Sequence, residues 1–176
     1  MLTIQKNAYG NVADRLGANG THSTLSGSNA SLVSRIIEPW NEFEVTWNNQ
    51  PAVSNQNQVV IPASTSKIQD YPNIDVTQLY QDILDNPSEG FGLKFQVVEE
   101  TPYRTMVFAS SDNANSDLWP ELKVCYSNEN PNETCLKFKP NGVDGQDASI
   151  RQQSPNENFS ESSLAAKAWT NGGTDV

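Results

Sequence analysis

The chain has 176 residues, a formal net charge of −10 and a hydrophobic content of 36%. A chain of this length is ordinarily one domain, or one and a fraction, and can bury a core. The negative charge argues against nucleic-acid binding, where basic side chains supply most of the affinity, and against binding to anionic membrane surfaces. Because no apolar run is long enough to span a bilayer, the sequence predicts no membrane insertion, and no signal-peptide pattern follows Met1.

Short strands separated by turn residues are predicted for the first part of the chain. Glycine, asparagine and serine residues indicate a loop-rich stretch after the first strand. Segment 44–47 alternates charged and apolar residues, which is typical of a strand with one buried face. The strands expected in this part are 2–5, 31–39, 44–47, 59–62 and 74–76.

One helix is predicted, at 77–86. Asp75 or Thr77 can cap its first turn, and Asn86-Pro87 ends it. Its apolar residues recur at helical spacing: Val76, Leu79, Tyr80, Ile83 and Leu84. Further strands are expected at 92–98, 105–110, 121–126, 136–139, 148–152 and 164–169, although 165–168 is equally consistent with a helix. This pattern predicts an all-β, jelly-roll-like β-sandwich with one short α-helix.

Several short motifs occur in a fixed order along the chain. The run PWNEFEVTWNNQP at 39–51 is followed by DVT at 75–77, GFGL at 90–93, FASS at 108–111 and PELKVCY at 120–126. In this order they resemble the second half of a DNRLRE domain, a β-sandwich family related to carbohydrate-binding modules. Segment 136–173, with GQDASI at 145–150, resembles the opening of a second copy. In the family's order, the second segment would lead into the first. The piece that would join Trp169 to Leu2, which includes the family's usual R-x-x-x-x-F-D strand, is missing.

The resemblance implies a displaced domain order. Residues 1–127 would form the larger, C-terminal part of a sandwich module, 128–134 a linker, and 135–176 the N-terminal strands of a second copy. Half a sandwich leaves open strand edges and an apolar face, both of which are unfavourable in water. The tail is therefore expected to complete its own sandwich or that of a neighbouring copy, and self-association is expected through residues 135–176.

Two functions follow from this organisation. One is a non-catalytic, extracellular or cell-surface module with a structural or adhesive role, which assembles head-to-tail into a fibre or surface array by strand complementation. The alternative is a carbohydrate-binding module of a polysaccharide-degrading enzyme or adhesin. An enzyme is not expected, because His22 sits in a polar loop without a motif and no G-x-S-x-G occurs. Local carboxylate pairs such as Glu42 with Glu44 are common by chance.

Sugar binding usually requires aromatic side chains beside polar groups. Trp40 and Trp47 lie within the family-like cluster, so core packing is their expected role. The candidates for a surface platform are Trp119, in a loop before Pro120, and two tyrosines beside prolines, with an arginine as hydrogen-bond donor. The predicted carbohydrate-binding residues are Trp119, Tyr71, Tyr103 and Arg104.

No cofactor is expected, with calcium as the one alternative, because oxygen-rich loops can supply the several ligands that this ion takes. Asn141, Asp144 and Asp147 could supply them, although the spacing is not that of an EF-hand and a plain polar turn explains the same residues. A similar loop contains Asp112, Asn113, Asn115 and Asp117.

The two cysteines, Cys125 and Cys135, bracket a polar stretch. They could form a disulfide or remain as two buried free thiols. A disulfide closing so short a loop would contribute about 2.5 kcal/mol and would mainly tie the linker.

Overall fold

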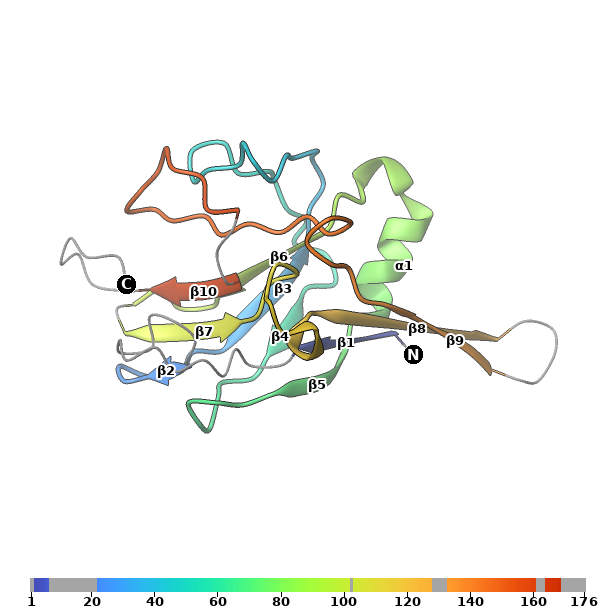
Figure 1. Cartoon of the computed structure of the whole chain (residues 1–176), viewed down its shortest axis with the longest axis horizontal. Helices are drawn as coiled ribbons and strands as arrows, with labels where there is room; N and C mark the ends of the chain where they lie inside the picture. The colour runs from blue at the N-terminus through green and yellow to red at the C-terminus, as the bar shows by residue number, and fades with distance from the viewer. Residues whose placement is uncertain (1, 7–21, 102, 128–132, 161–163, 169–176) are drawn as a thin grey trace.

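The computed structural model describes residues 2–6, 22–101, 103–127, 133–160 and 164–168 (Figure 1). Their elements, in chain order, are β1 (Leu2–Lys6), β2 (Ser23–Thr24), β3 (Ser31–Arg35), β4 (Val59–Ile61), β5 (Tyr71–Asp75), α1 (Thr77–Asp85), η1 (Pro87–Glu89), β6 (Leu93–Val97), β7 (Arg104–Phe108), η2 (Ser116–Leu118), β8 (Glu121–Ser127), β9 (Glu133–Phe138) and β10 (Leu164–Ala168). This confirms the predicted all-β sandwich with one short α-helix. None of the described helices is long and apolar enough to cross a membrane.

The described strands form antiparallel sheets with the orders β5-β1-β8-β9, β10-β7-β2 and β4-β3-β6. Strand β10 pairs with β7 of the same chain along its whole length, from Leu164 opposite Phe108 to Ala168 opposite Arg104. Cα atoms of β10 also come within 8 Å of those of β6. In Figure 1, β10 and β7 run side by side. The C-terminal strand therefore belongs to the body of this chain's own sandwich.

One apolar core joins strands of all these sheets with α1. Alternating β-branched and aromatic residues point inward from the strands, as expected for half-buried sheet faces. Each such side chain stabilises the fold by about 1.5–3 kcal/mol on burial. The buried members are Val33, Ile61, Tyr71, Val76, Leu79, Met106 and Phe108.

His22 lies in the wall of this core, although its polar local sequence is typical of a surface loop. Its side chain is 3% exposed. The imidazole packs edge-on against Tyr71 and Phe108, with ring centroids 5.7 and 5.5 Å away. Its Nδ1 accepts the Val107 backbone N–H at 3.2 Å, and its Nε2 lies 2.9 Å from the Gln69 carbonyl oxygen. The histidine therefore links the edge of β7 to the segment before β5.

The helix α1 begins at Thr77, as predicted, and ends at Asp85, one residue before the predicted end; its N-cap residue is Val76, which makes no side-chain capping bond. The Asp75 carboxylate accepts hydrogen bonds from the Thr77 backbone N–H at 3.0 Å and the Thr77 hydroxyl at 2.6 Å. These bonds lower the pKa of Asp75. Leu79 faces the core and is fully buried.

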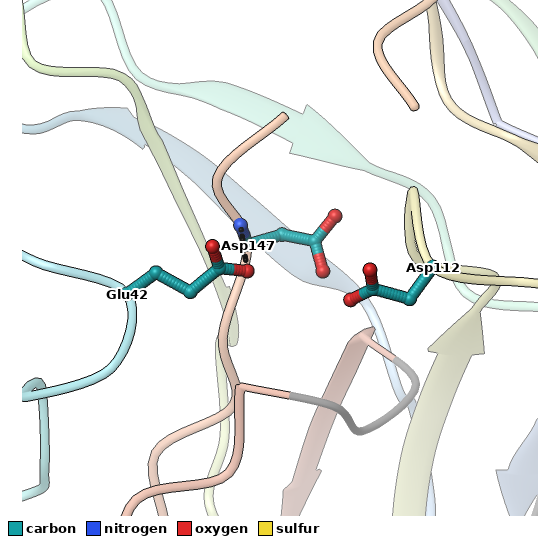
Figure 2. Close-up of side chains that lie close together, drawn as sticks. All are labelled: Glu42, Asp112 and Asp147. Carbon is teal, nitrogen blue, oxygen red and sulfur yellow. Dashed lines mark hydrogen bonds between the residues drawn. The ribbon is translucent and has the colours of Figure 1, made fainter. Parts of the chain in front are cut away.

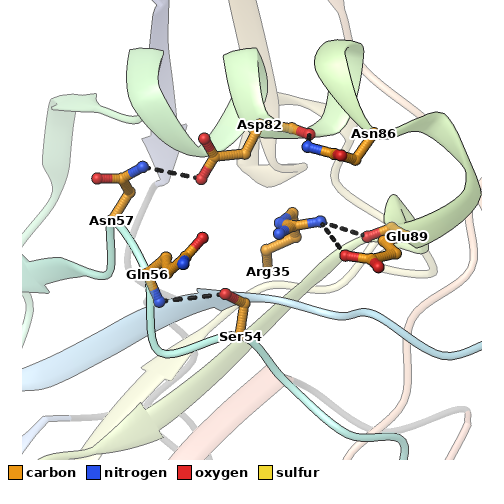
Figure 3. A network of polar contacts seen from close by, with 7 residues as sticks. All are labelled: Arg35, Ser54, Gln56, Asn57, Asp82, Asn86 and Glu89. Carbon is orange, nitrogen blue, oxygen red and sulfur yellow. Dashed lines mark hydrogen bonds and ion pairs between the residues drawn. The ribbon is translucent and has the colours of Figure 1, made fainter.

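A polar network holds α1 and η1 against β3 (Figure 3). The buried Arg35 guanidinium donates through Nη1 to the Glu89 carbonyl oxygen at 2.9 Å, and lies 3.5 Å from the Glu89 carboxylate. Asn57 Nδ2 donates to the Asp82 carboxylate at 2.9 Å, and Asn86 Nδ2 donates to the Asp82 carbonyl oxygen at 3.3 Å. Since these bonds connect the loop before β4, the helix and β3, the network is structural.

Two predicted strands are absent. Segment 44–47 is a turn, because the Asn41 carbonyl oxygen accepts the N–H groups of Glu44 and Val45 at 3.1 and 2.9 Å. Val45 is nevertheless buried. In segment 148–152, the strand is reduced to a single bridge between Ser149 and Phe159. In both places local turns replace the ladder that the alternating pattern predicted.

Strands β8 and β9 form a hairpin, with Cys125 directly opposite Cys135. The two are joined by a disulfide, and no free cysteine is present. The bond therefore staples the two strands of the hairpin together on either side of its loop.

Candidate functional site

The predicted carbohydrate-binding residues do not lie together. Tyr71 is only 4% exposed, and burial raises the pKa of its hydroxyl to about 12. The Arg104 guanidinium is buried and donates to the carbonyl oxygens of Ser28 and Ser26 at 3.2 and 3.0 Å, and it also pairs with Glu99. Because neither side chain is accessible to a glycan, the prediction that they bind carbohydrate is wrong. Both side chains have structural roles.

Tyr103 and Trp119 both reach the surface, but at opposite ends of β7. Tyr103 is exposed and precedes the first residue of β7. Trp119 is half-buried, and its Nε1 donates to the Asn113 carbonyl oxygen at 2.6 Å, which holds the indole on the loop that follows β7. Because a strand separates them, the two rings do not form one continuous platform.

The predicted calcium ligands are also divided. Asn141 and Asp144 form a closed turn in which the Asn141 side chain accepts the Val143 and Asp144 N–H groups and donates to the Asp144 carboxylate. The Asp147 carboxylate instead groups with those of Glu42 and Asp112. This corrects the predicted ligand set, since only Asp147 joins a cluster of carboxylates.

Figure 2 shows this acidic triad of Glu42, Asp112 and Asp147. One carboxylate oxygen of each residue lies within 4.8 Å of those of the other two. The residues come from three loops that are far apart in the sequence. Two hydrogen bonds fix them: the Asp147 N–H donates to Glu42 Oε1 at 3.1 Å, and the Ser111 N–H donates to Asp147 Oδ2 at 2.8 Å.

The triad concentrates negative charge where the access of solvent is limited. Glu42 is 8% exposed, and Asp147 is half-buried. Among the described residues, nothing donates a hydrogen bond to the buried Asp147 Oδ1. Neither Glu42 nor Asp147 takes part in the ion pairs found in the described part of the chain. Oxygens on opposite sides of a calcium ion are about 5 Å apart, so the spacing of the triad fits that ion.

Two glycines allow the third loop to approach the second. A Cβ atom at Gly145 would lie 2.7 Å from Ser111 Oγ and 2.8 Å from the Asn141 carbonyl oxygen. A Cβ atom at Gly142 would collide with the Asp112 carboxylate. Any larger residue would therefore push the loop carrying Asp147 away from Asp112.

The triad lies within a larger surface that we call the loop cluster, made of residues 41–49, 110–119 and 141–158. Asn158 Nδ2 donates to the Glu42 and Val45 carbonyl oxygens at 2.7 and 2.8 Å, which locks the third loop onto the first. Asn48 Nδ2 donates to Asn156 Oδ1 at 2.8 Å on the outside. Phe43, beside Glu42, is 72% exposed. The cluster thus combines an exposed ring, amides and carboxylates.

The sequence placed an acidic residue in each of these loops but did not connect them. Glu42 belongs to a local carboxylate pair, and Asp112 and Asp147 belong to two separate oxygen-rich loops. Their separation in the chain gives no periodic signal, so only the fold shows that they meet. Phe43 was missed because nothing in the sequence marks the 41–44 turn as exposed.

Comparison with known proteins gives one match. The sequence model of carbohydrate-binding module family 96 matches residues 12–126, well over half of the chain. No curated protein and no solved structure matches it. The match supports the carbohydrate-binding relationship that the motif order implied, without confirming the DNRLRE name.

Proposed function

This chain belongs to carbohydrate-binding module family 96, and we propose that it binds a polysaccharide through the loop cluster without catalysing a reaction. The observation that carries the proposal is the family match, which contains two of the three loops of the cluster, 41–49 and 110–119. A binding module needs no catalytic nucleophile, and the sequence contains no G-x-S-x-G motif. The predicted alternative function is thereby preferred over the purely structural one.

The chemistry of the loop cluster supports sugar binding. An exposed phenyl ring can pack against the C–H face of a sugar ring, and side-chain amides and carboxylates can take pairs of neighbouring hydroxyls. Phe43 supplies the ring, Asn48 and Asn156 supply amides, and Trp119 is carried by the same loop as Asp112. Tyr103, at the other end of β7, lies outside this surface.

The charge of the cluster favours an uncharged glycan. The whole chain carries a formal charge of −10, and the triad places three carboxylates at the proposed site. An acidic polysaccharide would meet like charges there. A neutral polysaccharide avoids this repulsion, and its hydroxyls can donate hydrogen bonds to exposed carboxylates of the loop cluster.

The experiment is affinity electrophoresis in gels that contain neutral or acidic polysaccharides. Phe43→Ala should weaken retention by roughly 5- to 30-fold, the range expected for loss of about 1–2 kcal/mol of ring burial. Tyr103→Ala is the matched control, because it also removes an exposed ring but at the far end of β7. Equal retention of the wild type and Phe43→Ala on every polysaccharide that binds would remove the loop cluster as the site.

We place the predicted calcium ion at the acidic triad rather than at the Asn141 turn. An ion there would join the three loops and neutralise most of their charge. The buried Asp147 Oδ1, to which no described group donates a hydrogen bond, supports this position. Binding of a neutral glycan would then be stronger with calcium than after treatment with a chelator.

A second candidate function is the structural or adhesive one at an extracellular or cell-surface location, with the tail completing a neighbouring sandwich. One observation supports it: β10 is a full-length partner of β7, and the described residues 139–160 before it contain no strand. If β10 exchanges between copies, the same pairing would form between chains. Deleting residues 161–176 should then abolish assembly, whereas assembly by the shortened chain would exclude donation by this strand.

A further inference from the structure

The hairpin of β8 and β9 has two chemically different faces. On one face Lys123 lies opposite Lys137, and the Lys137 ammonium pairs with the Glu121 carboxylate at 3.0 Å. The other face is apolar, because alternate residues of a strand point the same way. Its opposing pairs are Leu122 with Phe138, Val124 with Leu136, and Tyr126 with Thr134.

The apolar face is covered only where β8 lies against the core. Leu122 and Val124 on β8 pack against the core. On β9, Leu136 and Phe138 remain 44% and 48% exposed, and Tyr126 near the tip is exposed as well. Figure 1 shows the hairpin extending away from the rest of the molecule. An apolar sheet face that continues from the core into solvent marks an interaction surface.

Strand β9 also has an open edge, since it ends the sheet β5-β1-β8-β9 and no other described strand pairs with its outer side. The Cα atoms of Cys125 and Cys135 are 4.1 Å apart, the close spacing of a pair that is not hydrogen-bonded. The backbone N–H and C=O groups of Cys135 therefore point away from β8. By the two-residue repeat of a strand, those of Glu133 and Lys137 do so too.

We propose that β9 pairs antiparallel with β9 of a second copy of this chain, which joins two four-stranded sheets across a two-fold axis. Two registers pair the outward groups while using most of β9. With the axis at Cys135, Glu133 lies opposite Lys137 of the second copy. With the axis at Leu136, Glu133 lies opposite Lys139 of the second copy.

This charge pattern selects a second copy over other strands. Lysines on an edge strand discourage the addition of unrelated strands. In antiparallel self-pairing, one lysine of each copy lies opposite Glu133 of the other copy, either Lys137 or Lys139 according to the register, so the same charges become favourable. On the opposite face, Leu136 of one copy lies beside Leu136 of the other in both registers. The edge thus repels most strands and accepts its own.

The contact is small and closed. A single strand pair with a few apolar side chains buries less than the roughly 1,600 Å² of a standard interface, so the dimer should be weak and dependent on concentration. A two-fold contact occupies the β9 edge of both copies, so the assembly ends at a dimer. Exchange of β10 would instead form a head-to-tail chain of copies. The two modes therefore give different species in solution.

The test is sedimentation velocity of the full chain, without reductant, from micromolar to millimolar concentration. The wild type should show a monomer–dimer equilibrium. Glu133→Lys should weaken the dimer by about tenfold, because both symmetric charge pairs become repulsive. Adding Lys137→Glu should restore it if the axis lies at Cys135, and adding Lys139→Glu should restore it if the axis lies at Leu136. Lys67→Glu, an equal change of charge in the exposed loop before β5, is the control and should leave dimerisation unchanged.

Hydrogen exchange gives a readout that needs no variant. The backbone amides of Glu133, Cys135 and Lys137 should become protected only at concentrations where the dimer forms. A monomer at every concentration would overturn the proposal. So would a dimer that forms equally well with Glu133→Lys, or one whose formation leaves these amides unprotected. Glycan retention of the Glu133→Lys variant should stay unchanged, since the loop cluster contains none of these residues.

Discussion

Lowering the pH from 7.5 to 5.5 should destabilise this protein through one side chain, His22. The carbonyl oxygen of Gln69 can only accept a hydrogen bond, so Nε2 must carry a proton; the Val107 N–H can only donate, so Nδ1 must be bare. The fold therefore requires the neutral imidazole. Protonation of Nδ1 would direct an N–H at another N–H inside the core.

The sign of the effect follows from the pKa. Burial lowers the pKa of His22 below its usual value of 6.5, and the hydrogen bond to Gln69 and the charge of Asp70 oppose this only in part. Between the lowered folded value and 6.5 the unfolded chain binds more protons than the folded one, so stability is complete above about pH 7 and falls as the pH drops below 6.5.

The magnitude can be bounded. Uptake of one proton on unfolding costs at most about 1.4 kcal/mol per pH unit, so the free energy of unfolding should fall by up to about 1.4 kcal/mol between pH 7.5 and 5.5. For a chain of this size, that lowers Tm by roughly 3–5 °C. The chain contains a single histidine, so His22 is the one imidazole that titrates in this window.

The assay is urea denaturation at several pH values for the wild type and for His22→Gln, which keeps a donor toward Gln69 but does not titrate. The stability advantage of the wild type should shrink by about 1 kcal/mol between pH 7.5 and 5.5. A difference that is constant across this range, or an NMR titration of the single imidazole with an ordinary pKa, would refute the argument.

Three further predictions concern stability. Arg35→Ala should lower the free energy of unfolding by about 2–4 kcal/mol, because it removes a buried cation and its bond to the Glu89 carbonyl. Glu89→Gln should cost less than about 1 kcal/mol, since that side chain is 55% exposed. Equal losses in urea denaturation would contradict this. Calcium at 100 times its Kd should stabilise the wild type by about 2.7 kcal/mol but not Asp147→Asn, with magnesium as the control ion, and thermal unfolding that ignores calcium in both would remove the ion from the triad. Replacing Cys125 and Cys135 together by serine should cost about 2.5 kcal/mol in chemical denaturation, and no loss would mean that the hairpin is held in register without the bond.

The parts of the fold that the sequence predicts are those governed by local chemistry. The helix at Thr77–Asp85 follows from apolar spacing, from Asp75 before it and from the proline after it. Strand β3 follows from a run of apolar and β-branched residues. Such signals are carried by neighbouring residues and survive in almost any tertiary context.

The failures arise where a nearby turn or a distant contact overrides the pattern of a segment. The alternation at 44–47 is real, but Asn41 binds the backbone of this segment and turns it. His22 has a polar local sequence, yet the fold places it between aromatic rings. Tyr71 follows the same logic: a tyrosine before a proline seems suited to a surface loop, whereas here it begins a core strand.

The family match and the structure divide the chain differently, and the difference bears on function. The match ends at residue 126, but the residues after it supply β9, which extends one sheet, Asp147, which completes the triad, and β10, which pairs with β7. The matched residues hold two of the three loops of the proposed glycan site, and the segment beyond them locks onto the first loop through Asn158. Since Glu42 and Asp112 lie inside the match and Asp147 outside it, a binding surface built on all three depends on the later segment remaining docked. Any exchange of that segment between copies would carry Asp147 with it, so assembly and ligand binding would be coupled through the same loop.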